Sequence, residues 1–158
     1  MKVVERNKNT IKNTLVRSNP FKEECCQNPS CSLCDTGSRV NCKSREVVYK
    51  ITCAGEDERC KKAIYIGETS RSVAERFEEH RKMLRSERTR TKSFLYDHMQ
   101  LVHNGDPPSL NVKVVASCPG DASMRQALEA VIIRKEDPPL NRKQEWTNEP
   151  RKRKSENQ

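Results

Sequence analysis

Two short runs of β-branched and aromatic residues lie near the middle of the chain. The first is Val47 to Ile51 and the second is Ala63 to Ile66, with the polar residues 55–59 between them. Runs of this length and composition are typical of strands, and the polar stretch between them favours an antiparallel hairpin. A third apolar run, Leu110 to Ala116, predicts one more strand.

Three further segments repeat apolar residues at helical spacing. They predict helices over about 72–85, 93–103 and 121–137, the first of which opens with a capping box of Ser72 and Glu75. Prolines end the last helix. Its residues expected to face inward are Met124, Ala127, Leu128, Val131 and Ile132.

The order of these elements predicts an α+β domain in which the helices bury one face of a small three-stranded antiparallel sheet. Cysteines crowd the segment before it among small and polar residues, a composition that builds no apolar core and indicates a separate metal-bound knuckle. The chain then divides into a linker or helix remnant at 1–22, the knuckle at 23–44, the domain at 45–143 and a basic disordered tail at 144–158.

Composition narrows the function. Hydrophobic residues make up 33% of the 158 residues and charged residues 34%, so the core must be small. The net charge of +9 favours a polyanionic partner such as nucleic acid, although a basic protein without such a ligand remains the alternative. The sequence offers no secretory signal and no apolar stretch of the roughly 20 residues that span a membrane. We therefore expect a protein that is not secreted and has no membrane partner, and whose clustered thiols bind metal.

Several residues form an ordered set along the domain. They are Val47-Val48-Tyr49, then Tyr65-Ile66-Gly67-Glu68-Thr69, then Arg76 and His80 on one helix, then Glu129, and then Asn141. In this order the set resembles the GIY-YIG nuclease superfamily over about residues 46–143. The two valines replace the Gly and Ile of the name, whereas Tyr49 stands where the reactive tyrosine of the family stands.

The long gap between the two tyrosines holds Cys53 and Cys60, which looks like the nuclease domain of Penelope-like retroelements. Residues 41–49 and 137–141 are similar to that group as well. The resemblance implies a metal-dependent DNA endonuclease, a phosphodiesterase that nicks DNA for insertion of a retrotransposon. A reverse transcriptase encoded by the same element is a candidate second partner. The DNA partner and the basic tail indicate the nucleus, or otherwise the cytoplasm.

The resemblance also implies roles for three polar residues. Glu129 would bind one Mg²⁺ or Mn²⁺, which polarises the scissile phosphate and stabilises its leaving oxygen. Arg76 would clamp the nonbridging oxygens. Asn141 would orient the loop that holds the metal carboxylate, although after two prolines and a leucine it could equally be a turn residue.

A tyrosine would activate the attacking water. With an ordinary pKa of about 10, it needs positive charge nearby, which the metal and Arg76 could supply while His80 accepts a proton. Tyr49 and Tyr65 are both candidates, and Tyr49 is favoured.

Ordinary structural explanations compete with these roles. The two tyrosines could be a cross-strand aromatic pair. Arg76 could pair with a carboxylate of its own helix, and Glu129 with Arg125 four residues earlier. Only the joint order of the set favours the catalytic interpretation.

Two groups of residues are candidates for zinc. Cys53, Cys60, His98 and His103 provide two thiolates and two imidazoles, a tetrahedral set that zinc favours, and the resemblance to the Penelope-like domain agrees. The alternative is buried cysteines and surface histidines without a metal.

The candidate second zinc site lies in the knuckle. Its thiols are Cys25, Cys26, Cys31, Cys34 and Cys42, and the spacing of Cys31 and Cys34 lets two thiolates chelate one metal. A site with four thiolate ligands needs only one of the adjacent Cys25 and Cys26, so the order of the ligands stays open.

The sequence thus favours an endonuclease. The main alternative is a catalytically inactive, zinc-stabilised module that binds nucleic acid without cutting it, and a third is a degenerate element fragment. Nothing in the sequence selects an oligomeric state.

Overall fold

The computed structural model describes residue Cys26 and residues 28–38, 40–86 and 93–141. The expected linker at 1–22, Cys25 and the expected tail at 144–158 lie outside the described residues. Within the described ranges, no helix has the length and apolar character needed to cross a membrane.

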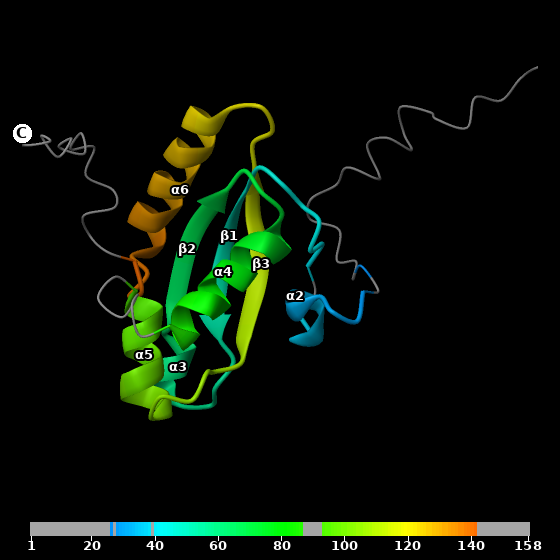
Figure 1. Ribbon diagram of the computed structural model, residues 1–158. Helices are drawn as coiled ribbons and strands as arrows, with labels where there is room; N and C mark the ends of the chain where they lie inside the picture. Colours follow the sequence, from blue (N-terminus) through cyan, green and yellow to red (C-terminus); the bar gives the residue numbers. More distant parts are fainter. Residues whose placement is uncertain (1–25, 27, 39, 87–92, 142–158) are drawn as a thin grey trace, which may run out of the picture.

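The described elements follow the predicted order closely (Figure 1). They are α2 (Ser32–Asp35), β1 (Val47–Cys53), α3 (Glu58–Lys61), β2 (Ile64–Thr69), α4 (Val73–Arg85), α5 (Phe94–His103), β3 (Leu110–Ser117) and α6 (Ala122–Glu136). The capping box that predicts the start of α4 is present, with both of its bonds between Ser72 and Glu75. The short helix α3, in the polar connection between β1 and β2, was not predicted because one turn leaves no periodic pattern.

The sheet has the strand order β2-β1-β3, with β1 in the centre and antiparallel to both neighbours. In this register Tyr49 lies opposite Gly67, and Tyr65 lies opposite Ile51. Because side chains alternate along a strand, both tyrosines point to the same face of the sheet. They are diagonal neighbours and do not form a directly opposed pair.

Helices cover both faces of the sheet. Tyr49 and Ile51 of β1 belong to the larger core, which they share with α4 and α5, and Figure 1 shows α4 lying across this face. Val48 and Ile66 belong to a smaller core with Ile133 of α6. The expectation that all the helices bury one face is therefore wrong for α6.

The inward face of α6 also differs from the prediction. Met124 and Val131 are exposed, whereas Ile133 and the charged Arg125 are buried. Leu128 and Ile132 do pack against the smaller core, partly buried. The apolar pattern predicts the wrong inward face because a charged residue such as arginine is expected at the surface when only the sequence is known.

The cysteine-rich segment shares its core with the sheet and is not separate from it. Leu33, Val40 and Cys42 are buried in the cluster that contains β1 and α4. Backbone carbonyls of this segment also receive the first amides of α4, because Val73 N donates to Ser44 O at 2.9 Å and Ala74 N donates to Cys42 O at 3.0 Å. The segment is thus attached to the amino end of the helix that carries Arg76 and His80.

Candidate functional site

A glycine in β2 makes room for the two tyrosines. An ideal Cβ at Gly67 would stand 2.6 Å from the Tyr49 Oη and 2.9 Å from Tyr65 Cε1, so the Tyr49 ring lies across β2 at this position. Tyr49 is 1% exposed, and the two ring centroids are 6.4 Å apart. Only a residue without a side chain allows this close approach.

The Tyr49 hydroxyl lies between two residues of α4. Arg76 Nε donates to the hydroxyl oxygen at 3.0 Å, and His80 Nε2 is 2.8 Å from the same atom. The spacing of four residues places both side chains on one face of α4. Because Arg76 can only donate, the hydroxyl proton is directed to His80 Nε2 in the tautomer that leaves this nitrogen free to accept.

Burial sets the charge states of this pair. It raises the pKa of Tyr49 far above its ordinary value, and the negative charge of an ionised Tyr65 would raise it further, while Arg76 opposes both. Burial, with the positive charge of Arg76, lowers the pKa of His80 to about 3. Both groups are therefore neutral at neutral pH.

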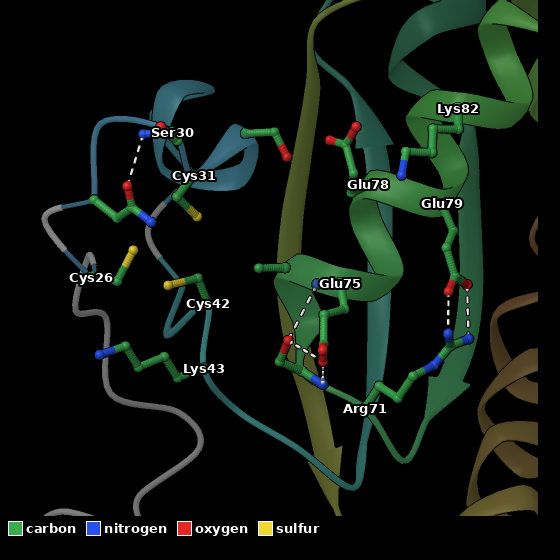
Figure 2. A pocket seen from close by; sticks show the side chains of 14 residues that line it. Cys26, Ser30, Cys31, Cys42, Lys43, Arg71, Glu75, Glu78, Glu79 and Lys82 are labelled. Carbon is green, nitrogen blue, oxygen red and sulfur yellow. Dashed lines mark hydrogen bonds and ion pairs between the residues drawn. The ribbon is translucent and has the colours of Figure 1, made fainter.

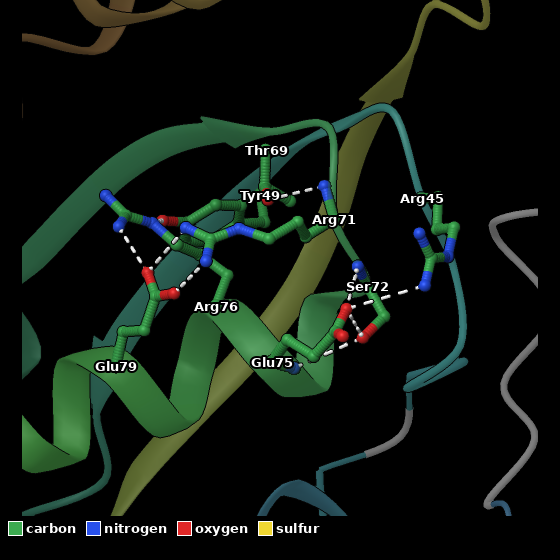
Figure 3. A network of polar contacts seen from close by, with 8 residues as sticks. All are labelled: Arg45, Tyr49, Thr69, Arg71, Ser72, Glu75, Arg76 and Glu79. Carbon is green, nitrogen blue, oxygen red and sulfur yellow. Dashed lines mark hydrogen bonds and ion pairs between the residues drawn. The ribbon is translucent and has the colours of Figure 1, made fainter.

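Arg76 is held from a second direction by Glu79, one turn along α4. Its Nη1 donates to Glu79 Oε2 at 2.8 Å, and Arg71 Nη2 donates to the same oxygen at 2.9 Å (Figure 3). The pairing of Arg76 with a carboxylate of its own helix is thus real, and it coexists with the bond to Tyr49. The prediction missed Glu79 and Arg71, although the three-residue spacing of Arg76 and Glu79 was a usable signal.

Glu129 approaches this group from α6, where it is partly buried. Its negative charge contributes to the raised pKa of Tyr49, after the larger effects of burial and Tyr65, so the carboxylate lies within electrostatic reach of the hydroxyl. Arg125, proposed as its structural partner, donates to Glu68 of β2 at 2.5 Å. A carboxylate in this position suits Mg²⁺, which keeps several waters and is commonly bound through one or two carboxylates and substrate phosphates.

Asn141 lies at the outer edge of β2 and is buried. Its Oδ1 accepts from Ile66 N at 2.8 Å, and its Nδ2 donates to Ile66 O at 2.7 Å. The side chain thus pairs with the strand that carries Tyr65 and Gly67, as a neighbouring strand would. Asn141 is also a turn residue, since its backbone N donates to Pro138 O at 3.2 Å, and the side-chain contact with β2 is made in addition.

Cys53, Cys60, His98 and His103 come together from the end of β1, from α3 and from α5. Each offers a ligand atom within 4.8 Å of the other three, and both thiols lie 3.3 Å from His103 Nε2. Ordinary zinc bond lengths place tetrahedral ligand atoms about 3.3 to 3.8 Å apart. Among the described residues, the buried His98 Nε2 is the one buried side-chain nitrogen or oxygen without a hydrogen-bond partner, which fits an atom reserved for a metal.

A second cluster contains Cys26, Cys31, Cys34 and Cys42, again with ligand atoms within 4.8 Å of one another. Figure 2 shows three of these sulfurs turned toward a common point. A groove of about 530 Å³ is lined by residues of this cluster on one side and by residues of α4 on the other. The Cys26 and Cys34 sulfurs are 3.7 Å apart, close to the separation of about 3.8 Å expected between thiolates on one zinc ion. None of the cysteines that the structure describes forms a disulfide.

One comparison with known proteins identifies the fold family. The family model described as the GIY-YIG catalytic domain matches residues 45–144, well over half of the chain. Neither the curated proteins nor the solved structures include a significant match. The matched residues span the sheet, both tyrosines, Arg76, His80 and Glu129, and the chain therefore belongs to the GIY-YIG catalytic domain family.

Proposed function

We propose that this protein is a DNA endonuclease that hydrolyses one phosphodiester bond per visit, using Tyr49, Arg76 and His80 as catalytic residues. The observation that carries the proposal is the buried Tyr49 hydroxyl, bonded to Arg76 on one side and to His80 on the other. Descent from a Penelope-like retroelement, a location in the nucleus and a reverse transcriptase partner belong to the same proposal.

Tyr49 acts as a proton relay between the attacking water and His80. A standing tyrosinate is costly in this site because burial raises the pKa of Tyr49. The hydroxyl instead receives a proton from water as it passes its own proton to His80 Nε2, 2.8 Å away. Burial and Arg76 lower the pKa of His80, so this transfer needs the negative charge of the bound phosphate to stabilise the protonated imidazole. The water oxygen then forms the new bond to phosphorus as the bond from phosphorus to the leaving oxygen breaks. The leaving oxygen takes up a proton from solvent, and His80 gives its proton back through Tyr49. Tyr65 packs against the His80 ring, with centroids 5.1 Å apart, and keeps it in place.

Arg76 contributes charge to the transition state. Its bonds to Tyr49 and Glu79 engage Nε and Nη1, and in the part of the chain described here no ion pair or hydrogen bond joins Nη2 to another side chain. This nitrogen can donate to a nonbridging phosphate oxygen, where negative charge develops. Glu129 would hold one Mg²⁺ or Mn²⁺, which would withdraw charge from the scissile phosphate and its leaving oxygen.

The two valines that depart from the family motif before Tyr49 belong to the cores on the two faces of the sheet. Val47 and Val48 are fully buried, one in the core under α4 and the other in the core under α6. The two valines therefore contribute to packing on β1.

The cluster of two thiols and two imidazoles and the cluster of four thiols are both proposed to bind structural zinc. Four protein ligands at each cluster leave no open position for water or phosphate, so neither ion takes part in the cleavage. The ion at Cys53, Cys60, His98 and His103 would join β1 and α3 to α5, and the ion in the knuckle would fix the segment that receives the first amides of α4.

Nicking of supercoiled plasmid in Mg²⁺ tests the proposal. Arg76→Ala and Glu129→Ala should each lower the rate about a thousandfold, as the loss of other transition-state contacts does, while DNA binding largely survives. Arg81→Ala is a matched control, because Arg81 lies on the same helix and both arginine side chains are 29% exposed.

We expect Arg81→Ala to nick the plasmid at the wild-type rate. If Glu129→Ala nicks fully and still requires Mg²⁺, the metal carboxylate lies elsewhere. If the wild-type chain binds DNA and leaves it intact, the binding module without catalysis becomes the correct function.

A further inference from the structure

The carboxylate of Glu79 lies between two guanidinium groups at the border of the candidate site (Figure 3). Its two oxygens receive both terminal nitrogens of Arg71, and one of these oxygens also accepts from Arg76 Nη1 at 2.8 Å. The Arg71 side chain is 55% exposed and that of Arg76 is 29% exposed, so the group reaches from solvent to the buried Tyr49. The relay through Tyr49 and His80 gives Glu79 no direct part in the chemistry.

The contact fixes the direction of the Arg76 guanidinium. This group is planar, so two bonds in different directions, from Nε to Tyr49 and from Nη1 to Glu79, set its plane. Without Glu79 the guanidinium could turn about its last bonds while keeping one contact. Nη2 would then no longer face a constant direction.

Glu79 is itself held in place. Arg71 binds it through a two-pronged contact, the geometry in which arginine and carboxylate are most directional. Burial alone would raise the pKa of Glu79, but the hydrogen bond from Arg76 and the charge of Arg71 hold it below its ordinary value. The carboxylate is therefore ionised, and the three groups carry one net positive charge.

We propose that Glu79 is a positioning residue, held by Arg71, which aims Arg76 Nη2 at the phosphate. The proposal rests on the function proposed above, because it needs Arg76 to contact the scissile group. A negative charge beside a phosphate site weakens the binding of DNA. Glu79 thus lowers the affinity for DNA in the ground state, and in return it fixes Arg76 in the orientation that the transition state requires.

Glu79→Gln should therefore have opposite effects on DNA binding and on the rate of nicking. Loss of the negative charge should tighten DNA binding about two- to fivefold, the size of a partly exposed charge interaction. The carboxamide of Gln has one acceptor oxygen and no charge, so it holds the two arginines less firmly. The looser guanidinium should slow nicking at saturating DNA about ten- to a hundredfold, as displacements of about 1 Å in other sites do. A purely structural role would move both quantities in the unfavourable direction.

Glu78→Gln is the matched control. Glu78 is the adjacent acid on α4, its side chain is 35% exposed against 32% for Glu79, and it pairs with Arg81 only at 3.9 Å. Both variants remove one charge from the same helix. We expect Glu78→Gln to nick at the wild-type rate.

The experiment measures single-turnover nicking of plasmid in Mg²⁺, and the affinity for a short duplex without Mg²⁺. Tighter binding with slower nicking in Glu79→Gln alone supports the proposal. Wild-type nicking by Glu79→Gln, an equal loss in Glu78→Gln, or a joint loss of binding and nicking in Glu79→Gln would each overturn it. A wild-type chain that does not nick refutes the proposed function and removes this proposal with it, an outcome distinct from the other three.

Discussion

Gly67→Ala is the sharpest test of the tyrosine arrangement. The added methyl would stand 2.6 Å from Oη and 2.8 Å from Cζ of Tyr49, and 2.9 Å from Cε1 of Tyr65. These separations are about 1 Å shorter than ordinary carbon contacts. Tyr49 is 1% exposed, so its ring cannot move aside without leaving its bonds to Arg76 and His80.

The expected cost has two parts. Overpacking of a filled core destabilises by about 1 to 3 kcal/mol, and the smaller conformational freedom of alanine in the unfolded chain offsets about 0.4 to 1 kcal/mol of this. The net loss of unfolding free energy should therefore lie between about 0 and 2.6 kcal/mol, with a middle value of about 1.3 kcal/mol. Nicking should fall much further, about a hundredfold, because the hydroxyl must shift by about 1 Å from its partners.

Gly120→Ala provides a control with a similar loss of stability. Gly120 has φ of 77°, and an added Cβ would meet no atom within 4 Å. The left-handed backbone should cost alanine about 1 to 2 kcal/mol without any contact with the tyrosines. Urea denaturation measures the first quantity and single-turnover nicking the second. If Gly67→Ala nicks as fast as Gly120→Ala, the tyrosines are not positioned as described.

Two other expectations concern zinc and pH. Elemental analysis should find zinc. Cys53→Ser should lose metal and unfold at a lower urea concentration than the control Cys118→Ser, whose thiol is partly exposed and lies in neither cluster. Equal metal content in the two variants would contradict this. Removal of Mg²⁺ alone should stop cutting and leave the circular dichroism spectrum unchanged. His80 has a pKa of about 3 in the folded chain and a higher, ordinary value when unfolded, so the unfolded chain takes up the proton first. Its contribution to stability should be complete above pH of about 6.5 and fall by about 1.4 kcal/mol per unit toward pH 3. The difference in unfolding free energy between wild type and His80→Gln should show this slope between pH 6.5 and 5, and a flat difference would contradict the burial of a neutral imidazole.

The sequence carried the local part of the fold well. The capping box at Ser72 marked the start of α4, and the spacing of Arg76 and His80 placed both on one face of that helix. Such signals depend on residues that are close together in the chain, so they can be recognised without knowledge of the tertiary structure.

Long-range pairings could not be predicted in the same way. The predicted inward face of α6 is wrong because Arg125 is buried. Its side chain is held there by a bond to Glu68, which lies 57 residues earlier in the chain. The role of Gly67 depends on the register of β1 against β2, which no single strand reveals. Glu79 is absent from the predicted site for another reason, because an acid three residues from Arg76 has the pattern of an ordinary ion pair on a helix surface.

The bonds of Asn141 have a consequence for the association of this protein with other chains. An open strand edge presents amides and carbonyls that can recruit a foreign strand, and this leads to aggregation. At Ile66 of the β2 edge both groups are already bound by one carboxamide, and Leu140 N occupies the carbonyl of Ile64 two residues earlier. The strand that supports both tyrosines is thus closed to intermolecular β-pairing at these positions by two residues, which leaves the adjacent surface free of a fourth strand.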